Sequence, residues 1–183
     1  MKKLIFSAVL ALISSSAFAQ FNIGSSTSSS TDIFGNTVTT HRDAYGRTTG
    51  TSTTSSNDIF GNSTTTHRDS YGRTIGTSVT SRTDILGNTT TTHTDRYGRT
   101  IGSSITGNTD VFGSSTTTHT DAYGRTTGTS TTDFNDIFGS YNTTHRNSYG
   151  QTIGTSNTSV MDIFGNTTTQ QNSNDRNTSI WTW

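Results

Sequence analysis

The chain repeats one stretch, Asp58-Ile-Phe-Gly-Asn-Ser-Thr-Thr-Thr-His-Arg-Asp-Ser-Tyr-Gly-Arg-Thr-Ile-Gly-Thr-Ser-Val-Thr (58–80), at intervals of 26 residues. The Asp that opens each copy recurs at Asp32, Asp58, Asp84, Asp110, Asp136 and Asp162. A fixed period in this range indicates that one supersecondary unit is repeated and that no single unit buries a core alone. We therefore expect the function to belong to the array.

Within each copy, single residue types recur in register. The aromatic or aliphatic column is Phe34, Phe60, Leu86, Phe112, Phe138 and Phe164, and the tyrosine column is Tyr45, Tyr71, Tyr97, Tyr123 and Tyr149. Every histidine lies in one further column: His41, His67, His93, His119 and His145. A disordered polar linker has no reason to keep such columns, so the register indicates ordered structure.

Each copy is predicted to contain two strands and two turns. Thr, Ile, Val and Tyr favour strands, while the Asp-x-Phe-Gly and Asp-x-Tyr-Gly segments are typical of turns in which Gly takes positive φ and the aromatic packs beneath. Ile75 and Val79 share one parity, which predicts that this face of the second strand is the inside. His41 should then face away from Val38.

The predicted fold class is therefore all-β, with the 26-residue repeats forming a β-solenoid or another stacked strand-turn-strand array. In such a stack the Phe and Tyr columns become continuous structural ladders about 4.8 Å apart from layer to layer. The same turn signals are compatible with an antiparallel β-meander of successive hairpins. The sequence leaves both geometries open.

Four segments are expected along the chain. Residues 1–19 have a basic start, a short apolar run and the ending Ala17-Phe18-Ala19, which is typical of a secretory signal peptide. A Ser/Gly-rich leader follows at 20–31, then the repeats at 32–169, five full and a partial sixth. The tail at 170–183 is a predicted cap or anchor built on Ile180, Trp181 and Trp183. We expect export across the inner membrane to the periplasm, the cell surface or the exterior.

The composition restricts the kinds of partner that the protein is expected to bind. After cleavage, ten Arg face twelve Asp, interleaved in every repeat, and there is no Cys. A nucleic-acid binder needs a basic face, so no nucleic-acid partner is expected, and no transmembrane segment is predicted in the mature chain. Self-association is the expected interaction, with cell-surface or matrix partners as further candidates.

This plan of signal peptide, short leader and about five strand-turn-strand repeats without proline is similar to that of the curli-type functional amyloid subunits of bacteria. The resemblance implies self-assembly into extracellular fibres. The corners Asp43-Ala-Tyr-Gly-Arg-Thr-Thr and Asp32-Ile-Phe-Gly-Asn-Thr also resemble the core of YD repeats in Rhs-type shell proteins. That second resemblance implies β-structure with turns at these corners.

No enzyme activity and no cofactor are expected, because catalysis needs different groups converging on one point, whereas here each candidate His or Asp is copied in every repeat. The five histidines are candidate metal ligands, since imidazole binds zinc, copper and nickel. The simpler expectation is that each is a polar strand residue partnered by a neighbouring Asp or Thr.

We therefore expect a secreted structural repeat protein that self-assembles, by pairing of exposed terminal strands, into cell-surface or extracellular fibres or matrix. Such a protein would serve as a functional amyloid or an adhesin-like component of a biofilm. The competing class is a monomeric binding module whose polar face takes a metal, a glycan or ice. The two classes are distinguished by whether the protein assembles as its concentration rises.

Overall fold

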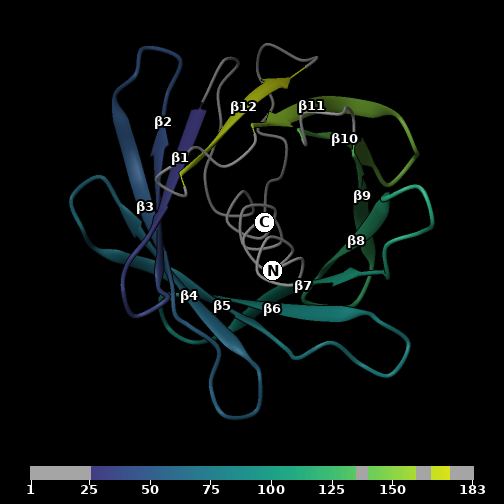
Figure 1. Ribbon diagram of the computed structural model, residues 1–183, viewed down its shortest axis with the longest axis horizontal. Helices are drawn as coiled ribbons and strands as arrows, with labels where there is room; N and C mark the ends of the chain where they lie inside the picture. The colour runs from purple at the N-terminus through teal and green to yellow at the C-terminus, as the bar shows by residue number, and fades with distance from the viewer. Residues whose placement is uncertain (1–25, 135–139, 160–165, 174–183) are drawn as a thin grey trace.

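The computed structural model describes residues 26–134, 140–159 and 166–173, and this part of the chain is all-β. Figure 1 shows the strands as a ring, with the colour passing around it in chain order. The strands are β1 (Ser26–Thr31), β2 (Thr37–Arg42), β3 (Thr48–Thr54), β4 (Ser63–Asp69), β5 (Thr74–Thr80), β6 (Thr89–Asp95), β7 (Thr100–Thr106), β8 (Ser115–Asp121), β9 (Thr126–Phe134), β10 (Tyr141–Asn147), β11 (Thr152–Thr158) and β12 (Thr167–Ser173).

Every strand pairs antiparallel with its neighbours in sequence, and β1 also pairs with β12, so the sheet closes into a barrel. One 26-residue repeat is thus one hairpin, as in β2–β3 or β4–β5. The predicted all-β class and the strand-turn-strand repeat are confirmed. The predicted solenoid is wrong, and the antiparallel meander describes the pairing, because each strand bonds to the strand before and after it rather than to its own copy in the next repeat.

The closing strand comes from the segment expected to be a leader. Ser26–Thr31 forms β1, and its registers place Ser29 opposite both Thr39 of β2 and Thr167 of β12. The strand β12 also extends into the expected tail, to Ser173. The terminal strands therefore present no open edge to another chain, and the expected pairing of exposed terminal strands is wrong for this closed form.

The inner and outer faces are the reverse of the sequence-based expectation. Thr39 and His41 of β2 are buried on the inner face, as are Gly50 and Ser52 of β3. Val79, on the face predicted to be inside, is 43% exposed. As expected, His41 faces away from Val38. A period of two separates two faces but does not say which one is concave, and here the inner face carries the small polar residues.

The corners have the hydrogen bonds of a tight turn closed by glycine. At the first corner the Gly35 amide donates to the Asp32 carbonyl, the Asp32 amide donates to the Asn36 carbonyl, and Gly35 has φ of 81°. The Asp32 carboxylate accepts the amides of Phe34 and Asn36, each at 2.9 Å. The predicted turns with positive-φ Gly are confirmed, and the bonds from the two amides to Asp32 hold this turn together.

Glycine is required inside the strands for a different reason. A side chain on Gly50 would place its Cβ 2.4 Å from the Arg68 carbonyl oxygen on β4. Gly50 also lies opposite His41 in the register of β2 and β3. At the corner, by contrast, a Cβ on Gly46 would have no atom within 4 Å and would suffer only the strain of φ at 77°.

Two substitutions separate these causes. We expect Gly46→Ala to lower the free energy of unfolding by about 1 kcal/mol, the usual cost of a left-handed non-glycine residue. Gly50→Ala should cost about 3 kcal/mol, because the backbone of β4 must move away. Urea unfolding followed by circular dichroism measures both. Equal costs would contradict the close approach of β3 and β4.

Candidate functional site

A belt of alternating histidines and serines runs along the inner face of the barrel. His67 on β4 illustrates its unit: its Nδ1 lies 2.9 Å from the Ser52 hydroxyl on β3, and its Nε2 lies 2.9 Å from the Ser78 hydroxyl on β5. The same unit continues from strand to strand. The belt consists of His41, Ser52, His67, Ser78, His93, Ser104, His119, Ser130, His145 and Ser156, joined by contacts of 2.7–3.0 Å.

A single neutral tautomer satisfies this belt. If each Nε2–H donates to one serine hydroxyl, the hydroxyls of Ser52, Ser78, Ser104 and Ser130 each donate to the Nδ1 of the next histidine, so every imidazole N–H and each of these four hydroxyls meets an acceptor. A proton added to one ring removes an acceptor from the chain. The belt is therefore complete only with uncharged imidazoles.

Burial of the imidazoles also favours their uncharged form. It lowers the pKa of His41, His93 and His145 to about 4. Burial, together with the smaller effect of the neighbouring histidines, lowers the pKa of His67 and His119 to about 3. Charging a buried ring costs its solvation energy, and each ring has similar rings beside it along the belt.

The belt corrects the expected partners of the histidines. Four of the rings bond to serines on both adjacent strands and His41 bonds to Ser52, whereas the expected partners were a neighbouring Asp or Thr. Within the part of the chain that the structure describes, no three His, Cys or Asp side chains lie grouped to hold a metal ion. A hydroxyl stands between successive imidazoles, which keeps the histidine column from forming a metal cluster.

Sequence reasoning missed the serine column, although Ser52, Ser78, Ser104, Ser130 and Ser156 are themselves spaced by 26 residues. It also missed Gln171, which follows His145 by the same interval and lies opposite Ser156 on β12. Gln171 is buried at the histidine position of the last strand. Both the serine column and Gln171 can be found in the sequence by following the 26-residue interval on the strands next to those that carry the histidines.

A second row of paired hydroxyls lies beside the belt. Ser29 bonds Thr39 at 2.8 Å between β1 and β2, and five threonine pairs repeat this contact around the barrel at 2.8–3.0 Å. They are Thr54–Thr65, Thr80–Thr91, Thr106–Thr117, Thr132–Thr143 and Thr158–Thr169. The buried face is thus held by side-chain hydrogen bonds instead of apolar contacts.

The lowered histidine pKa values predict acid sensitivity well above the range where Asp titrates. Between pH 6.5 and about 4 the unfolded chain binds protons at its histidines and the folded barrel does not, so stability falls as the pH falls through this window. We expect a loss of about 1 kcal/mol per histidine for each pH unit below 6.5, comparable for five rings to the whole stability of a domain. Urea unfolding at pH 7.5, 6.0 and about 5 measures this loss. A constant free energy of unfolding across the series would contradict the buried neutral belt.

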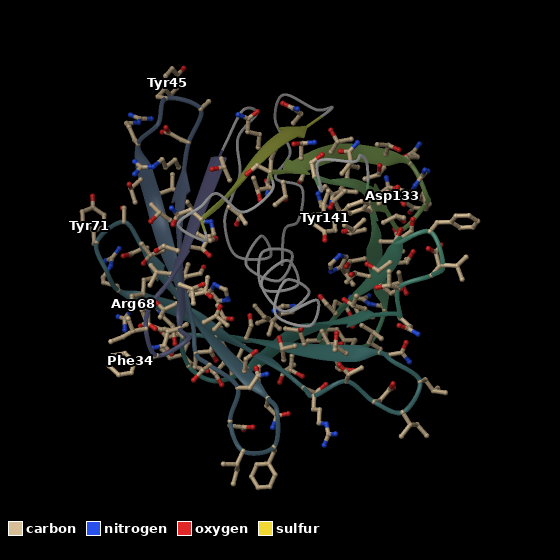
Figure 2. The ribbon with its side chains drawn as sticks, viewed as in Figure 1. Phe34, Tyr45, Arg68, Tyr71, Asp133 and Tyr141 are labelled. Carbon is tan, nitrogen blue, oxygen red and sulfur yellow. The ribbon has the colours of Figure 1, made fainter. Side chains whose placement is uncertain are left out.

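The corners form two rims at opposite ends of the barrel. We call the end with the Asp-x-Phe-Gly corners the Phe rim, with described corners 32–36, 58–62, 84–88 and 110–114, and the other end the Tyr rim, with corners 43–47, 69–73, 95–99, 121–125 and 147–151. Figure 2 shows Phe34, Tyr45 and Tyr71 projecting away from the strands.

Side chains at both rims are exposed, which corrects the expected ladders. On the Phe rim, Ile33 is 93% and Phe34 75% exposed, and on the Tyr rim Tyr45 is 85% exposed. Side chains at the middle of such a turn point outward, so the aromatics do not pack beneath the corners. The exposed members on the Phe rim are Ile33, Phe34, Ile59, Phe60, Ile85, Leu86, Val111 and Phe112. Phe138 and Phe164, and the expected cap of Ile180, Trp181 and Trp183, lie outside the described residues.

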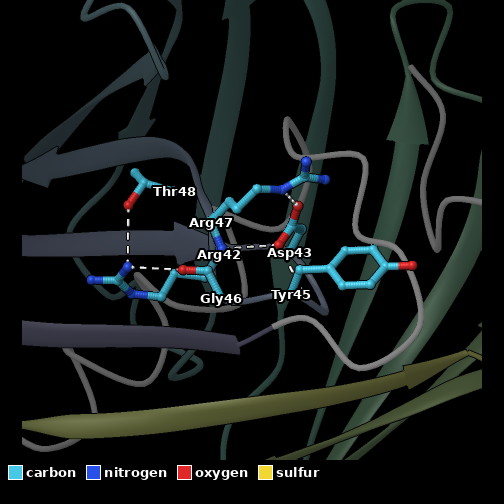
Figure 3. Close-up of polar contacts among 6 residues, drawn as sticks. All are labelled: Arg42, Asp43, Tyr45, Gly46, Arg47 and Thr48. Atoms are coloured by element: carbon cyan, nitrogen blue, oxygen red, sulfur yellow. Dashed lines mark hydrogen bonds and ion pairs between the residues drawn. The ribbon is translucent and has the colours of Figure 1, made fainter.

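The first Tyr corner is drawn in Figure 3. The Asp43 carboxylate accepts the amides of Tyr45 and Arg47 and the Arg47 Nε, which lies 2.7 Å from Oδ2. Arg42 reaches the Gly46 carbonyl at 3.1 Å and the Thr48 hydroxyl at 3.3 Å. The Arg47 guanidinium also lies over the Tyr45 ring, 5.3 Å from its centroid.

The last Tyr corner shows which part of the carboxylate the turn needs. Asn147 stands where the others have Asp, and its Oδ1 accepts the amides of Tyr149 and Gln151. Its Nδ2 donates to the Gln151 Oε1 at 2.9 Å, where the other corners have an ion pair. The fold of the corner therefore needs the oxygen acceptor and not the charge.

A double substitution tests this reading. We expect Asp43→Asn with Arg47→Gln to change the free energy of unfolding by less than about 0.5 kcal/mol, because Asn147 and Gln151 already make this corner and an exposed ion pair contributes little. Asp43→Ala should cost about 1–2 kcal/mol through two lost amide bonds. Thermal and urea unfolding compare the two. A double variant as unstable as Asp43→Ala would show that the corner requires the charge.

No helix in the described ranges is long and apolar enough to cross a membrane. No protein-family model matches the chain, and comparison with curated proteins and with solved structures likewise gives no match.

Proposed function

We propose that this is an exported structural protein that self-assembles into cell-surface or extracellular fibres or matrix, and that its copies meet through the rims of the barrel. The observation that carries the proposal is the repeated exposure of large apolar side chains at the corners. Ile33, Ile59 and Val111 are each 93% exposed. The hydrogen bonds of the turn involve only the backbone and polar side chains such as those of Asp32 and Asn36, so these apolar residues make none of the hydrogen bonds that hold the corner.

The energetics favour docking of several corners at once. Complete burial of one such side chain contributes about 1.5–3 kcal/mol, whereas association costs about 4–15 kcal/mol in lost freedom of motion. One corner with its Ile and Phe contributes about 3–6 kcal/mol, which offsets only the lowest values of that cost. The eight exposed side chains of the Phe rim together supply about 12–24 kcal/mol before costs, which is sufficient for stable contact.

The closed barrel changes the mechanism expected from the curli-like plan. Because β1 and β12 are paired, addition of strands at an edge would require the barrel to open. The rims need no such opening. Export rests on the signal-type segment at 1–19, and a chain without Cys is compatible with an oxidising compartment because no disulfide has to form.

The experiment uses the chain from Gln20 to Trp183 at about 1–100 μM, with sedimentation velocity and electron microscopy as readouts. We expect particles that grow with concentration. Successive corners such as Asp32 and Asp43 are 11 residues apart, so tilted strands predict an axial repeat of about 25–30 Å in stacked barrels.

Two comparisons make this experiment specific. Val79→Thr with Ile105→Thr removes exposed apolar residues from the outer face, at positions where Thr53 and Thr131 stand in other repeats, and it should assemble like the parent chain. A monomer that persists across the concentration range would contradict assembly and favour the binding module. Fibre diffraction with a sharp axial 4.8 Å reflection would instead show cross-β fibres and contradict assembly by intact barrels.

A further inference from the structure

The two rims carry opposite net charge. Counting on both rims the strand and loop residues that flank the corners, the described part of the Tyr rim holds eight Arg, at 42, 47, 68, 73, 96, 99, 125 and 146, against four Asp, at 43, 69, 95 and 121, a difference of +4. The described part of the Phe rim holds Arg82 alone against five Asp, at 32, 58, 84, 110 and 133, a difference of −4. The barrel is therefore electrically polar along its axis.

The charge difference originates in the partners of the corner carboxylates. At the Tyr rim Asp43 is paired with Arg47, and the four ion pairs of this kind are each neutral by themselves. At the Phe rim the residue in the Arg47 position is Asn36, which bonds Asp32 at 3.0 Å without a charge. The Asn36 side chain and the nearby amides lower the pKa of Asp32, so this carboxylate is ionised at neutral pH.

The surplus cations of the Tyr rim are placed beside exposed aromatics. Arg42 and Arg68 each donate to the carbonyl of a corner glycine, and Arg96 lies over the Tyr97 ring at 4.6 Å from its centroid. These guanidinium groups retain further donors for a carboxylate or an aromatic face. The Phe rim presents a carboxylate at each described corner and an aromatic ring at three of the four, with Leu86 at the corner 84–88.

The rims also match in spacing. Corners on either rim are separated by two strands, which corresponds to about 10 Å along the sheet. Because the two rims belong to one barrel, they have the same circumference and the same interval between corners. A second copy of this chain therefore offers an array of corners in step with the first, which a partner without the repeat would not.

We propose that the copies stack head to tail, with the Phe rim of one barrel seated on the Tyr rim of the next. This inference rests on the proposed function and specifies its interface. Two Phe rims would bring −4 against −4, and two Tyr rims +4 against +4, so both head-to-head arrangements are electrostatically unfavourable. A heterologous contact along the barrel axis does not close on itself and generates an open filament.

Two variants each block one rim. The Phe-rim variant carries Phe34→Ser, Phe60→Ser, Leu86→Ser and Phe112→Ser, all at exposed positions. The Tyr-rim variant carries Arg42→Thr, Arg68→Thr, Arg96→Ala and Arg146→Thr, which are residues found at the equivalent positions Thr94, Thr120 and Ala44. Circular dichroism and urea unfolding establish that both remain folded, and the Val79→Thr/Ile105→Thr chain is the matched control.

Each blocked variant alone should remain monomeric at concentrations at least tenfold above those at which the parent chain assembles. Mixed in equal amounts, the variants should form a 1:1 complex and grow no further, because each supplies one intact rim. Light scattering coupled to size exclusion measures the stoichiometry. Raising the salt from 50 mM to 500 mM should weaken assembly of the parent chain at least tenfold, because the complementary charges are screened.

The other outcomes separate the two proposals. If the parent chain assembles and one blocked variant alone forms a dimer, the contact is head to head and the inference is overturned while the proposed function stands. If both blocked variants assemble like the parent chain, the rims are not the interface and the inference is overturned. If the parent chain itself does not assemble, the proposed function fails, and the head-to-tail contact fails with it.

Discussion

The pairing of β1 with β12 is the constraint on which the rest of the structure depends. It joins Ser26–Thr31 to Thr167–Ser173, segments separated by almost the whole repeat array. Without this pairing the sheet has two open edges and no inside, so the inner belts would face solvent and the corners would not form rims. Closing a loop of this length costs conformational entropy that only the completed barrel offsets.

The inner face shows how a chain with so little apolar material orders itself. Buried hydroxyls and imidazoles are costly when unpaired, but the His–Ser belt and the threonine pairs give them partners on adjacent strands. Each such hydrogen bond contributes only modestly, and breaking one leaves two buried groups unsatisfied. The repeated His and Ser therefore fix the register of the strands, because shifting one strand by one residue would turn its His or Ser to the outer face.

At the corners, the residues that fold the turn are different from the residues that are exposed to solvent. Backbone bonds to the Asp side chain and a positive-φ Gly fold each turn, and the Asn147 corner reproduces that geometry without charge. The aromatic tips and the unequal pairing of Asp at the two rims are consequently free to vary without affecting the fold. A large exposed side chain, Phe, Leu or Tyr, nevertheless stands at every described corner, and for this reason we propose the rims, and not the inner belt, as the surface of contact between molecules.

Several features of the fold and the candidate site were predictable from residues alone. The strands, the turns with Asp and Gly, and the opposite facing of Val38 and His41 follow from local backbone preferences and a period of two. The serine column was equally visible in the sequence at its 26-residue interval. The strand β1 was hidden because Ser29 precedes its corner Asp32 by three residues, whereas Thr54 precedes Asp58 by four.

The sequence by itself thus determined the hairpin unit, its length and its corners, since these depend on neighbours a few residues apart. Only the tertiary structure decided that the hairpins pair side by side and close, that the face with Ile75 and Val79 is the outer one, and that the Phe and Tyr columns are exposed rather than stacked. These choices depend on curvature and on the meeting of β1 with β12. Neither is encoded in a period of two or of 26 residues, because both periods are the same for a solenoid, an open meander and a barrel.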